Sequence, residues 1–198
     1  MLDTGVRKKT AFIFDAGARV FETMGFSPLS VTVLALLIGL GASVLYLLSF
    51  PAAAVITLWV SGYLDAVDGA LARRTGRVSP LGSFLDVFFD RIVEAGILLS
   101  LGIVHPGSSF PLLCAALSIV LSMTAFLLTG TLVKKESEKS FFYQSGLMER
   151  TEGFIIFSLM WLFPDVLNVL GYLCAGLILF TACQRALMTA LILRKEKS

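Results

Sequence analysis

Long apolar segments, separated by short polar stretches, account for most of the chain. Six of these segments contain roughly 20 mainly apolar residues, the length at which a helix crosses the hydrocarbon core of a bilayer. They cover residues 29–48, 52–72, 81–104, 110–133, 146–163 and 166–193. The pattern therefore predicts an all-α integral membrane protein with six transmembrane helices.

The segment before the first predicted span has a different pattern. Within residues 6–25, apolar side chains recur at helical spacing, while Asp15, Arg19 and Glu22 occupy other positions. This spacing is typical of an amphipathic helix lying in the membrane interface, although a solvated leader helix that packs on nothing has the same pattern. We expect no removable signal peptide. The expected organisation is an interfacial helix over 1–28, a six-helix domain over 29–193 and a cytoplasmic tail over 194–198.

The composition indicates that lipid covers much of the surface. Hydrophobic residues make up 57% of the 198 residues and charged residues 15%, whereas a soluble domain carries about 25% charged residues. The net charge of +2 gives no sign of a nucleic-acid partner. The three cysteines lack the spacing of metal ligands. A soluble globular domain is therefore excluded.

Positive charges gather on one side of the predicted spans. Lysine and arginine flank the start of the first span, the second–third and fourth–fifth connections, and the end of the sixth span. The connections around Pro51, Pro106 and Pro164 contain neither residue. Because positive residues concentrate in cytoplasmic loops, both termini are expected in the cytoplasm and the number of spans is even. His105 then lies in an outer connection, where we expect no chemical role.

Four aspartates interrupt two adjacent predicted spans. Asp65 and Asp68 are three residues apart near the end of the second span, and Asp86 and Asp90 are four apart near the start of the third. Each spacing places the pair on one helix face, and the short connection makes the two helices antiparallel neighbours. At about 1.5 Å of rise per residue, Asp65 and Asp90 lie roughly 12 Å inside their helix ends. The four carboxylates can therefore converge within the membrane.

Converging carboxylates in a low-dielectric site stay ionised only when cations neutralise them. Oxygen ligands without histidine or cysteine suit Mg²⁺, Mn²⁺ or Ca²⁺, and two ions that share carboxylates form an arrangement used in phosphoryl transfer. Two other interpretations fit charge and spacing alone. The aspartates can form structural ion pairs with Arg73 and Arg91, or they can line a cation pathway. The residues by themselves leave all three open.

Further residues around the aspartates complete a longer motif. The chain resembles the CDP-alcohol phosphatidyltransferase family, whose signature it matches at eight positions in identity and spacing. These positions are Asp65, Asp68, Gly69, Ala72, Arg73, Gly82, Asp86 and Asp90. Six spans with cytoplasmic termini also agree with that family's fold, and the resemblance covers essentially the whole chain.

The resemblance implies a role for each matching residue. Two metal ions, Mg²⁺ with Mn²⁺ as an alternative, would be bound by Asp65, Asp68, Asp86 and Asp90. Asp90 would also be the general base that takes the proton from the acceptor hydroxyl, with attack at the lipid-side phosphorus and departure of CMP. Contacts to the CDP-linked lipid are implied for Leu29, Ser30, Val31, Thr32, Asp65, Gly69, Ala72, Arg73, Ser79 and Gly82.

Within the family, the chain resembles phosphatidylinositol-phosphate synthases and their archaeal ether-lipid counterparts. The similarity lies in residues 146–152 and at 184–185. It implies that the acceptor is a phosphorylated polyol such as inositol phosphate, with glycerol 3-phosphate or an unphosphorylated alcohol as alternatives. The residues implied to hold the acceptor phosphate are Lys134, Lys135, Arg150 and Arg185. The structural alternative for the two arginines is membrane anchoring, or pairing with Glu149 and Glu152.

The overall prediction is a phosphatidyl or archaetidyl transferase that takes CDP-diacylglycerol or an ether-lipid equivalent. By resemblance it is a multi-pass homodimer of the cell (inner) membrane, with its active site facing the cytoplasm. A divalent cation transporter and a catalytically inactive scaffold are the competing classes. Transport has no need of Gly69, Arg73 and Gly82 at these spacings, and an inactive scaffold has no need of four carboxylates.

Overall fold

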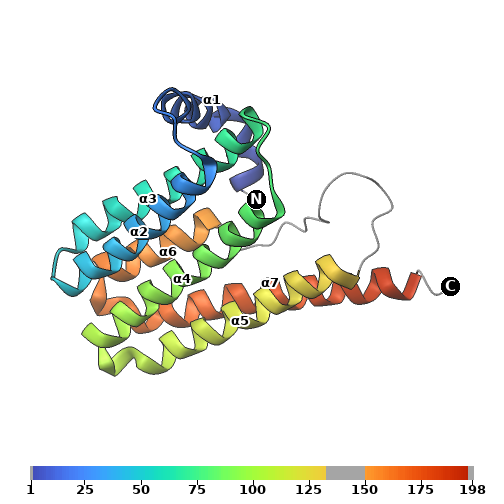
Figure 1. Cartoon of the computed structure of the whole chain (residues 1–198). Coiled ribbons are helices and arrows are strands. Elements are labelled where there is room, and N and C mark those ends of the chain that lie inside the picture. Colours follow the sequence, from blue (N-terminus) through green and yellow to red (C-terminus); the bar gives the residue numbers. More distant parts are fainter. Residues whose placement is uncertain (1, 133–149, 196–198) are drawn as a thin grey trace.

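The computed structural model describes residues 2–132 and 150–195, with side chains over 12–132 and 150–194. Every regular element within these ranges is a helix, which confirms the all-α prediction there (Figure 1). The long helices are α1 (Leu2–Thr23), α2 (Pro28–Leu47), α3 (Pro51–Arg74), α4 (Pro80–Val104), α5 (Ser109–Leu132), α6 (Arg150–Leu162) and α7 (Leu167–Lys195). Two 3₁₀ turns, Pro106–Ser108 and Pro164–Val166, precede α5 and α7.

Proline sets where three of the helices begin. Pro28, Pro51 and Pro80 are the first residues of α2, α3 and α4, a position that suits proline because its missing N–H has no intrahelical partner there. Before α2, the Ser27 hydroxyl accepts a hydrogen bond from the Ser30 N–H at 3.1 Å, and the Ser30 hydroxyl accepts one from the Ser27 N–H at 3.0 Å. The predicted spans began one residue too late at all three prolines.

Small residues allow the helices of the bundle to approach closely. α2 packs along α3 and also against α4, α5 packs along α7, and α6 lies against both α3 and α7 (Figure 1). A Cβ atom built on Gly39 of α2 would lie 2.6 Å from a methyl group of Val93 in α4. One built on Gly62 of α3 would lie 2.5 Å from the ring of Phe154 in α6. Glycine at these two positions lets α2 approach α4, and α3 approach α6, around the polar residues described below.

The N-terminal helix α1 lies across the end of the bundle and packs on α3 (Figure 1). Ala18 is fully buried, and the ring of Phe14 lies 6.0 Å from that of Tyr63. The Tyr63 hydroxyl donates a hydrogen bond to the carbonyl oxygen of Ile13 at 3.3 Å. These contacts exclude the alternative in which the leader helix packs on nothing.

Four helical segments are long and apolar enough to cross a membrane within the described ranges. They are Pro28–Leu47, Pro51–Arg74, Pro106–Leu132 and Pro164–Arg194. α4 has the necessary length but carries four charged residues, Asp86, Asp90, Arg91 and Glu94, and is therefore not among them. The described part of α6 has only 13 residues, and the expected start of its span, 146–149, lies outside the described residues.

Aromatic residues close the end of the bundle opposite α1. The Tyr46 hydroxyl shares a hydrogen bond of 2.8 Å with Nε2 of His105, and the Trp161 ring stacks on Tyr46 with centroids 5.4 Å apart. His105 therefore has a structural partner in the connection after α4.

Candidate active site

The four aspartates gather where α3 and α4 face each other. Asp65 and Asp68 come from α3, and Asp86 and Asp90 from α4. The carboxylates of Asp68, Asp86 and Asp90 all lie within electrostatic reach of Asp65 and of the Arg150 guanidinium. The structure therefore brings the two pairs together, as the three- and four-residue spacings predict.

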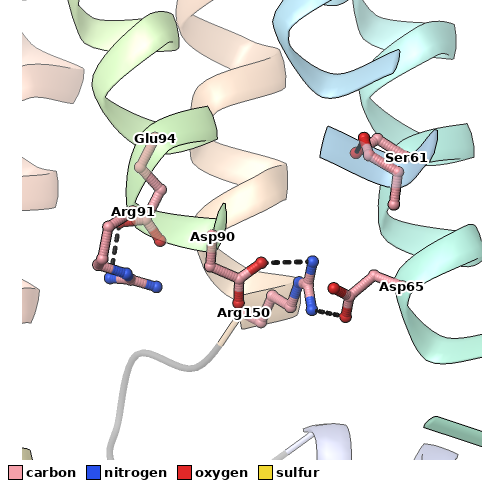
Figure 2. A network of polar contacts seen from close by, with 7 residues as sticks. Ser61, Asp65, Asp90, Arg91, Glu94 and Arg150 are labelled. Atoms are coloured by element: carbon pink, nitrogen blue, oxygen red, sulfur yellow. Dashed lines mark hydrogen bonds and ion pairs between the residues drawn. The ribbon is translucent and has the colours of Figure 1, made fainter. Parts of the chain in front are cut away.

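Arg150, at the start of the described part of α6, lies between the two pairs. Its guanidinium donates to Asp65 Oδ2 through Nη1 and forms an ion pair of 2.7 Å with Asp90 Oδ1 through Nη2 (Figure 2). The same group lies 5.5 Å from the centre of the Phe154 ring. One cation thus joins α3, α4 and α6. Sequence reasoning identified Arg150 as a candidate but assigned it to the acceptor phosphate, not to the aspartates.

Two other arginines were considered as partners of the aspartates, and of these Arg91 lies within electrostatic reach of Asp90. Nη1 of Arg91 forms an ion pair of 2.7 Å with Oε2 of Glu94, three residues later on α4. Nη1 of Arg73 lies 3.4 Å from where a Cβ would stand on Gly69, so Arg73 folds back along its own helix. Glu94 was missed by the sequence analysis. The signal was available, because residue 94 follows Asp90 by four positions and lies within an apolar segment.

The donor set suits a hard divalent cation. All four acids offer oxygen atoms, the ligands that Mg²⁺ and Mn²⁺ prefer. Oδ2 of Asp68 is buried without a hydrogen-bond partner, and the carboxylates of Asp65 and Asp90 already converge on a positive charge. Within the described ranges no three acidic, histidine or cysteine side chains lie close enough together to ligate one ion, and the Arg150 guanidinium is paired with both Asp65 and Asp90. The four acids fit a hard divalent cation by the chemistry of their donor atoms, while in this structure the guanidinium of Arg150 pairs with two of them.

The residues predicted to hold the CDP group lie at the ends of α3 and α4. Gly69, Ala72 and Arg73 belong to the last turns of α3. Ser79 caps α4, and its hydroxyl accepts a hydrogen bond from the Gly82 N–H at 3.1 Å. Ser79 therefore has a structural role at the start of α4 whether or not it also contacts a ligand.

The four residues predicted at the start of α2 point in different directions. The Thr32 hydroxyl lies beside the Asp68 carboxylate and donates to the carbonyl oxygen of Pro28 at 3.0 Å. Val31 is fully buried in the α1–α2–α3 core, whereas Leu29 is exposed. The Ser30 hydroxyl is engaged in the cap with Ser27. Only Thr32 of this group faces the aspartates.

A cavity of about 240 Å³ opens beside Asp90 and is lined by residues of α4, α5, α6 and α7. Both predicted phosphate-binding arginines of the described chain, Arg150 and Arg185, belong to its wall. Nη1 of Arg185 donates to the hydroxyl of Ser122 at 3.4 Å, and its guanidinium lies 5.3 Å from the ring of Phe126. Lys134, Lys135 and Glu149 lie outside the described residues.

A second cavity, of about 390 Å³, lies on the other side of Arg150, between α1, α3 and α6. Asp65 and Arg73 belong to its wall, together with apolar and aromatic side chains such as Phe14 and Trp59. Arg150 therefore belongs to the walls of both cavities, of which the first includes Asp90 and the second Asp65. The class that these features define is a helical membrane protein with an acidic centre between two cavities, each of which has acidic and basic side chains in its wall.

Comparison with known proteins gives the family. The CDP-alcohol phosphatidyltransferase family matches residues 26–192, so the chain belongs to this family of transferases. Archaetidylinositol phosphate synthase of Pyrococcus horikoshii is 33% identical over 183 residues, which cover 91% of this chain and 92% of that protein. The inner membrane protein YnjF of Escherichia coli is 30% identical over 189 residues, covering 88% and 90%. The two non-enzyme classes considered above, a transporter and a scaffold, are thereby set aside.

Solved structures show the same fold. Phosphatidylinositol phosphate synthase of Mycobacterium tuberculosis with CDP-DAG bound superimposes with a TM-score of 0.75 at 21% identity, covering 89% of this chain and 93% of that one. The same enzyme in complex with manganese and citrate gives a TM-score of 0.73 at 22% identity, covering 89% and 88%.

Proposed function

We propose that this enzyme transfers a phosphatidyl or archaetidyl group from a CDP-linked lipid to a hydroxyl of a phosphorylated polyol such as inositol phosphate, with release of CMP. The observation that carries the proposal is the cavity beside Asp90, whose wall contains both Arg150 and Arg185. A dianionic acceptor must approach a diphosphate that is already negative, so it needs a positively charged cavity. The names of the relatives support the same acceptor class.

Asp90 is proposed as the general base. Its carboxylate lies at the wall of this cavity, so it can take the proton from the acceptor hydroxyl. The hydroxyl oxygen then bonds to the lipid-side phosphorus, the bond from that phosphorus to the CMP oxygen breaks, and CMP leaves. Gly69, Ala72, Arg73 and Gly82 are proposed to hold the cytidine diphosphate at the ends of α3 and α4.

Two divalent ions are proposed to be held by Asp65, Asp68, Asp86 and Asp90, with Mg²⁺ as the cellular metal and Mn²⁺ as a substitute. When bound, such ions neutralise the diphosphate and stabilise the charge that develops during transfer. The manganese complex of the Mycobacterium tuberculosis enzyme supports divalent metal binding in a protein of the same fold. The all-oxygen donor set and the unpartnered Asp68 Oδ2 support it in this chain.

The membrane arrangement is part of the proposal. α4 and α6 complete a set of six spans, with both termini and the active site on the cytoplasmic side of the cell membrane and α1 in the interface. Two copies form a homodimer. The packing of α1 on α3 supports its position beside the site, because Tyr63 is two residues from Asp65.

The proposal is tested by product analysis. The purified protein is incubated with Mg²⁺ and either CDP-diacylglycerol or its ether-lipid equivalent, together with inositol phosphate, glycerol 3-phosphate, free inositol and serine. We expect a single major product, the inositol-phosphate lipid, by mass spectrometry, and none when EDTA is added. If serine were the only acceptor converted to product, Arg150 and Arg185 would not serve to bind a phosphorylated acceptor.

A pair of arginine variants makes the test specific to the cavity. Arg185→Gln is expected to raise the KM for inositol phosphate without changing that for the CDP-linked lipid. Arg194→Gln removes the same charge from the exposed end of the same helix, and its kinetics are expected to match those of the wild type. Equal effects of the two substitutions would mean that Arg185 acts only through overall charge.

A further inference from the structure

The cavity beside Asp90 contains an acidic residue to which the proposed reaction gives no part. Glu94 lies one turn beyond Asp90 on α4 (Figure 2). It also lies two turns beyond Asp86, so the spacing places the three carboxylates along one side of the helix. At about 1.5 Å per residue, Glu94 lies roughly 6 Å farther from the start of α4 than Asp90. It belongs to the wall of the 240 Å³ cavity together with Arg150 and Arg185.

Glu94 also belongs to the wall of a third, smaller space between the aspartates. This space is lined by Thr32, Asp65, Asp90 and Arg150 among others. The Glu94 side chain is only 17% exposed, and Arg91 holds it from the same helix through the 2.7 Å ion pair. The pairing with Arg91 offsets part of the cost of burying this carboxylate, and it leaves Glu94 in the walls of two spaces that also contain Asp90 and Arg150.

The charged side chains of the cavity favour different parts of a phosphorylated acceptor. The guanidinium groups of Arg150 and Arg185 attract a phosphate, whereas the Glu94 carboxylate repels one. An ionised carboxylate accepts hydrogen bonds and donates none, so the groups it favours are hydroxyls. A cavity of about 240 Å³ is slightly smaller than the roughly 300–1,000 Å³ typical for drug-sized ligands and suits a small polar solute.

We propose that Glu94 accepts hydrogen bonds from the ring hydroxyls of the acceptor and is a specificity-determining residue for a polyol with several hydroxyls. Arg91 positions it. This inference rests on the proposed function, because it assumes a phosphorylated polyol in this cavity, but it assigns recognition of the hydroxyls separately from recognition of the phosphate.

Two measurements on Glu94→Gln separate these parts. The first is the KM for inositol phosphate at saturating CDP-diacylglycerol, which is expected to rise about tenfold or more, since hydrogen bonds to a charged group are lost. The second is the inhibition constant of inorganic phosphate, which occupies only the arginine side and is expected to stay unchanged or fall. Glu22→Gln, the same change at an exposed α1 residue paired with Arg74, is expected to change neither.

Each outcome decides the inference. A rise in both constants would show that the substitution disrupts the cavity as a whole, and no change in either would show that Glu94 does not touch the acceptor. Both results overturn the inference. The proposed function is unaffected by them as long as the wild-type enzyme uses inositol phosphate. A wild-type enzyme that does not use inositol phosphate overturns both. Glu94→Asp, which keeps the charge but withdraws it by one methylene, is a second variant and is expected to raise the same KM by a smaller factor.

Discussion

The Arg150→Gln substitution gives a prediction with two effects of opposite sign. In the structure, the Arg150 guanidinium is paired with both Asp65 and Asp90, and it also lines the proposed acceptor cavity. Removing its charge should therefore strengthen divalent metal binding in the absence of substrates, because the guanidinium no longer competes for the carboxylates. The same substitution should weaken binding of the phosphorylated acceptor.

The size of the first effect follows from the two ion pairs. The Arg150 side chain is 32% exposed and those of Asp65 and Asp90 are 11% and 21% exposed, so the pairs are partly shielded from water. A hydrogen bond to a charged group contributes about 1.5–3 kcal/mol, and about 1.4 kcal/mol corresponds to a factor of ten. Allowing for the exposure of the pairs, we expect the Kd for Mn²⁺ to fall about tenfold.

The assay is the electron paramagnetic resonance signal of free Mn²⁺, titrated with purified protein in detergent without lipid substrate. Arg74→Gln is the matched control, because Arg74 pairs with Glu22 on the surface of α1 and α3 and its loss leaves the aspartates as they are. The KM for inositol phosphate is then measured on the same samples and is expected to rise tenfold or more. Unchanged or weaker Mn²⁺ binding by Arg150→Gln would refute the placement of the metal at these aspartates.

Three further substitutions test the base, the packing and the end of the bundle opposite α1. Asp90→Asn is expected to lower CMP release by about 10²-fold or more, because the proton acceptor is lost, and unchanged release would remove Asp90 from that role. Gly39→Ala is expected to cost about 1–3 kcal/mol, seen as a lower thermal midpoint in detergent, since its Cβ meets a methyl group of α4 at 2.6 Å. Gly41→Ala, with nothing within 4 Å, is the control, and equal losses would contradict the close approach. Tyr46→Phe is expected to cost about 0.5–1.5 kcal/mol by losing the hydrogen bond to His105, and an unshifted midpoint would show that this bond contributes nothing.

The apolar pattern predicted the starts of α2, α3 and α4 well because local sequence sets where a helix begins. Runs of apolar residues end at proline-containing connections, and the helices begin at Pro28, Pro51 and Pro80, within a residue of the expected starts. The spacing of the aspartates likewise predicted that each pair shares a helix face. These features depend on residues only a few positions apart, so they can be predicted from local sequence patterns.

Contacts between distant segments could not be predicted in the same way. Arg150 follows Asp65 by 85 positions, and no local pattern indicates that its guanidinium joins Asp65 to Asp90. The hydrogen bond from the Gly82 N–H to the Ser79 hydroxyl is local by contrast, since a serine directly before a helix is a typical cap, and contact of Ser79 with the nucleotide stays a prediction. Glu94 was within reach of sequence reasoning, since it continues the four-residue spacing of Asp86 and Asp90.

Joining three helices through a single guanidinium makes the site sensitive to insertions and deletions. An extra residue in α3 between Gly62 and Asp65 would rotate the carboxylate by about 100° and shift it by about 1.5 Å relative to the packed glycine. Asp65 would then face a different neighbour while Gly62 still fitted against Phe154. The number of residues between packing glycines and charged groups is therefore as constrained as the identity of the residues themselves.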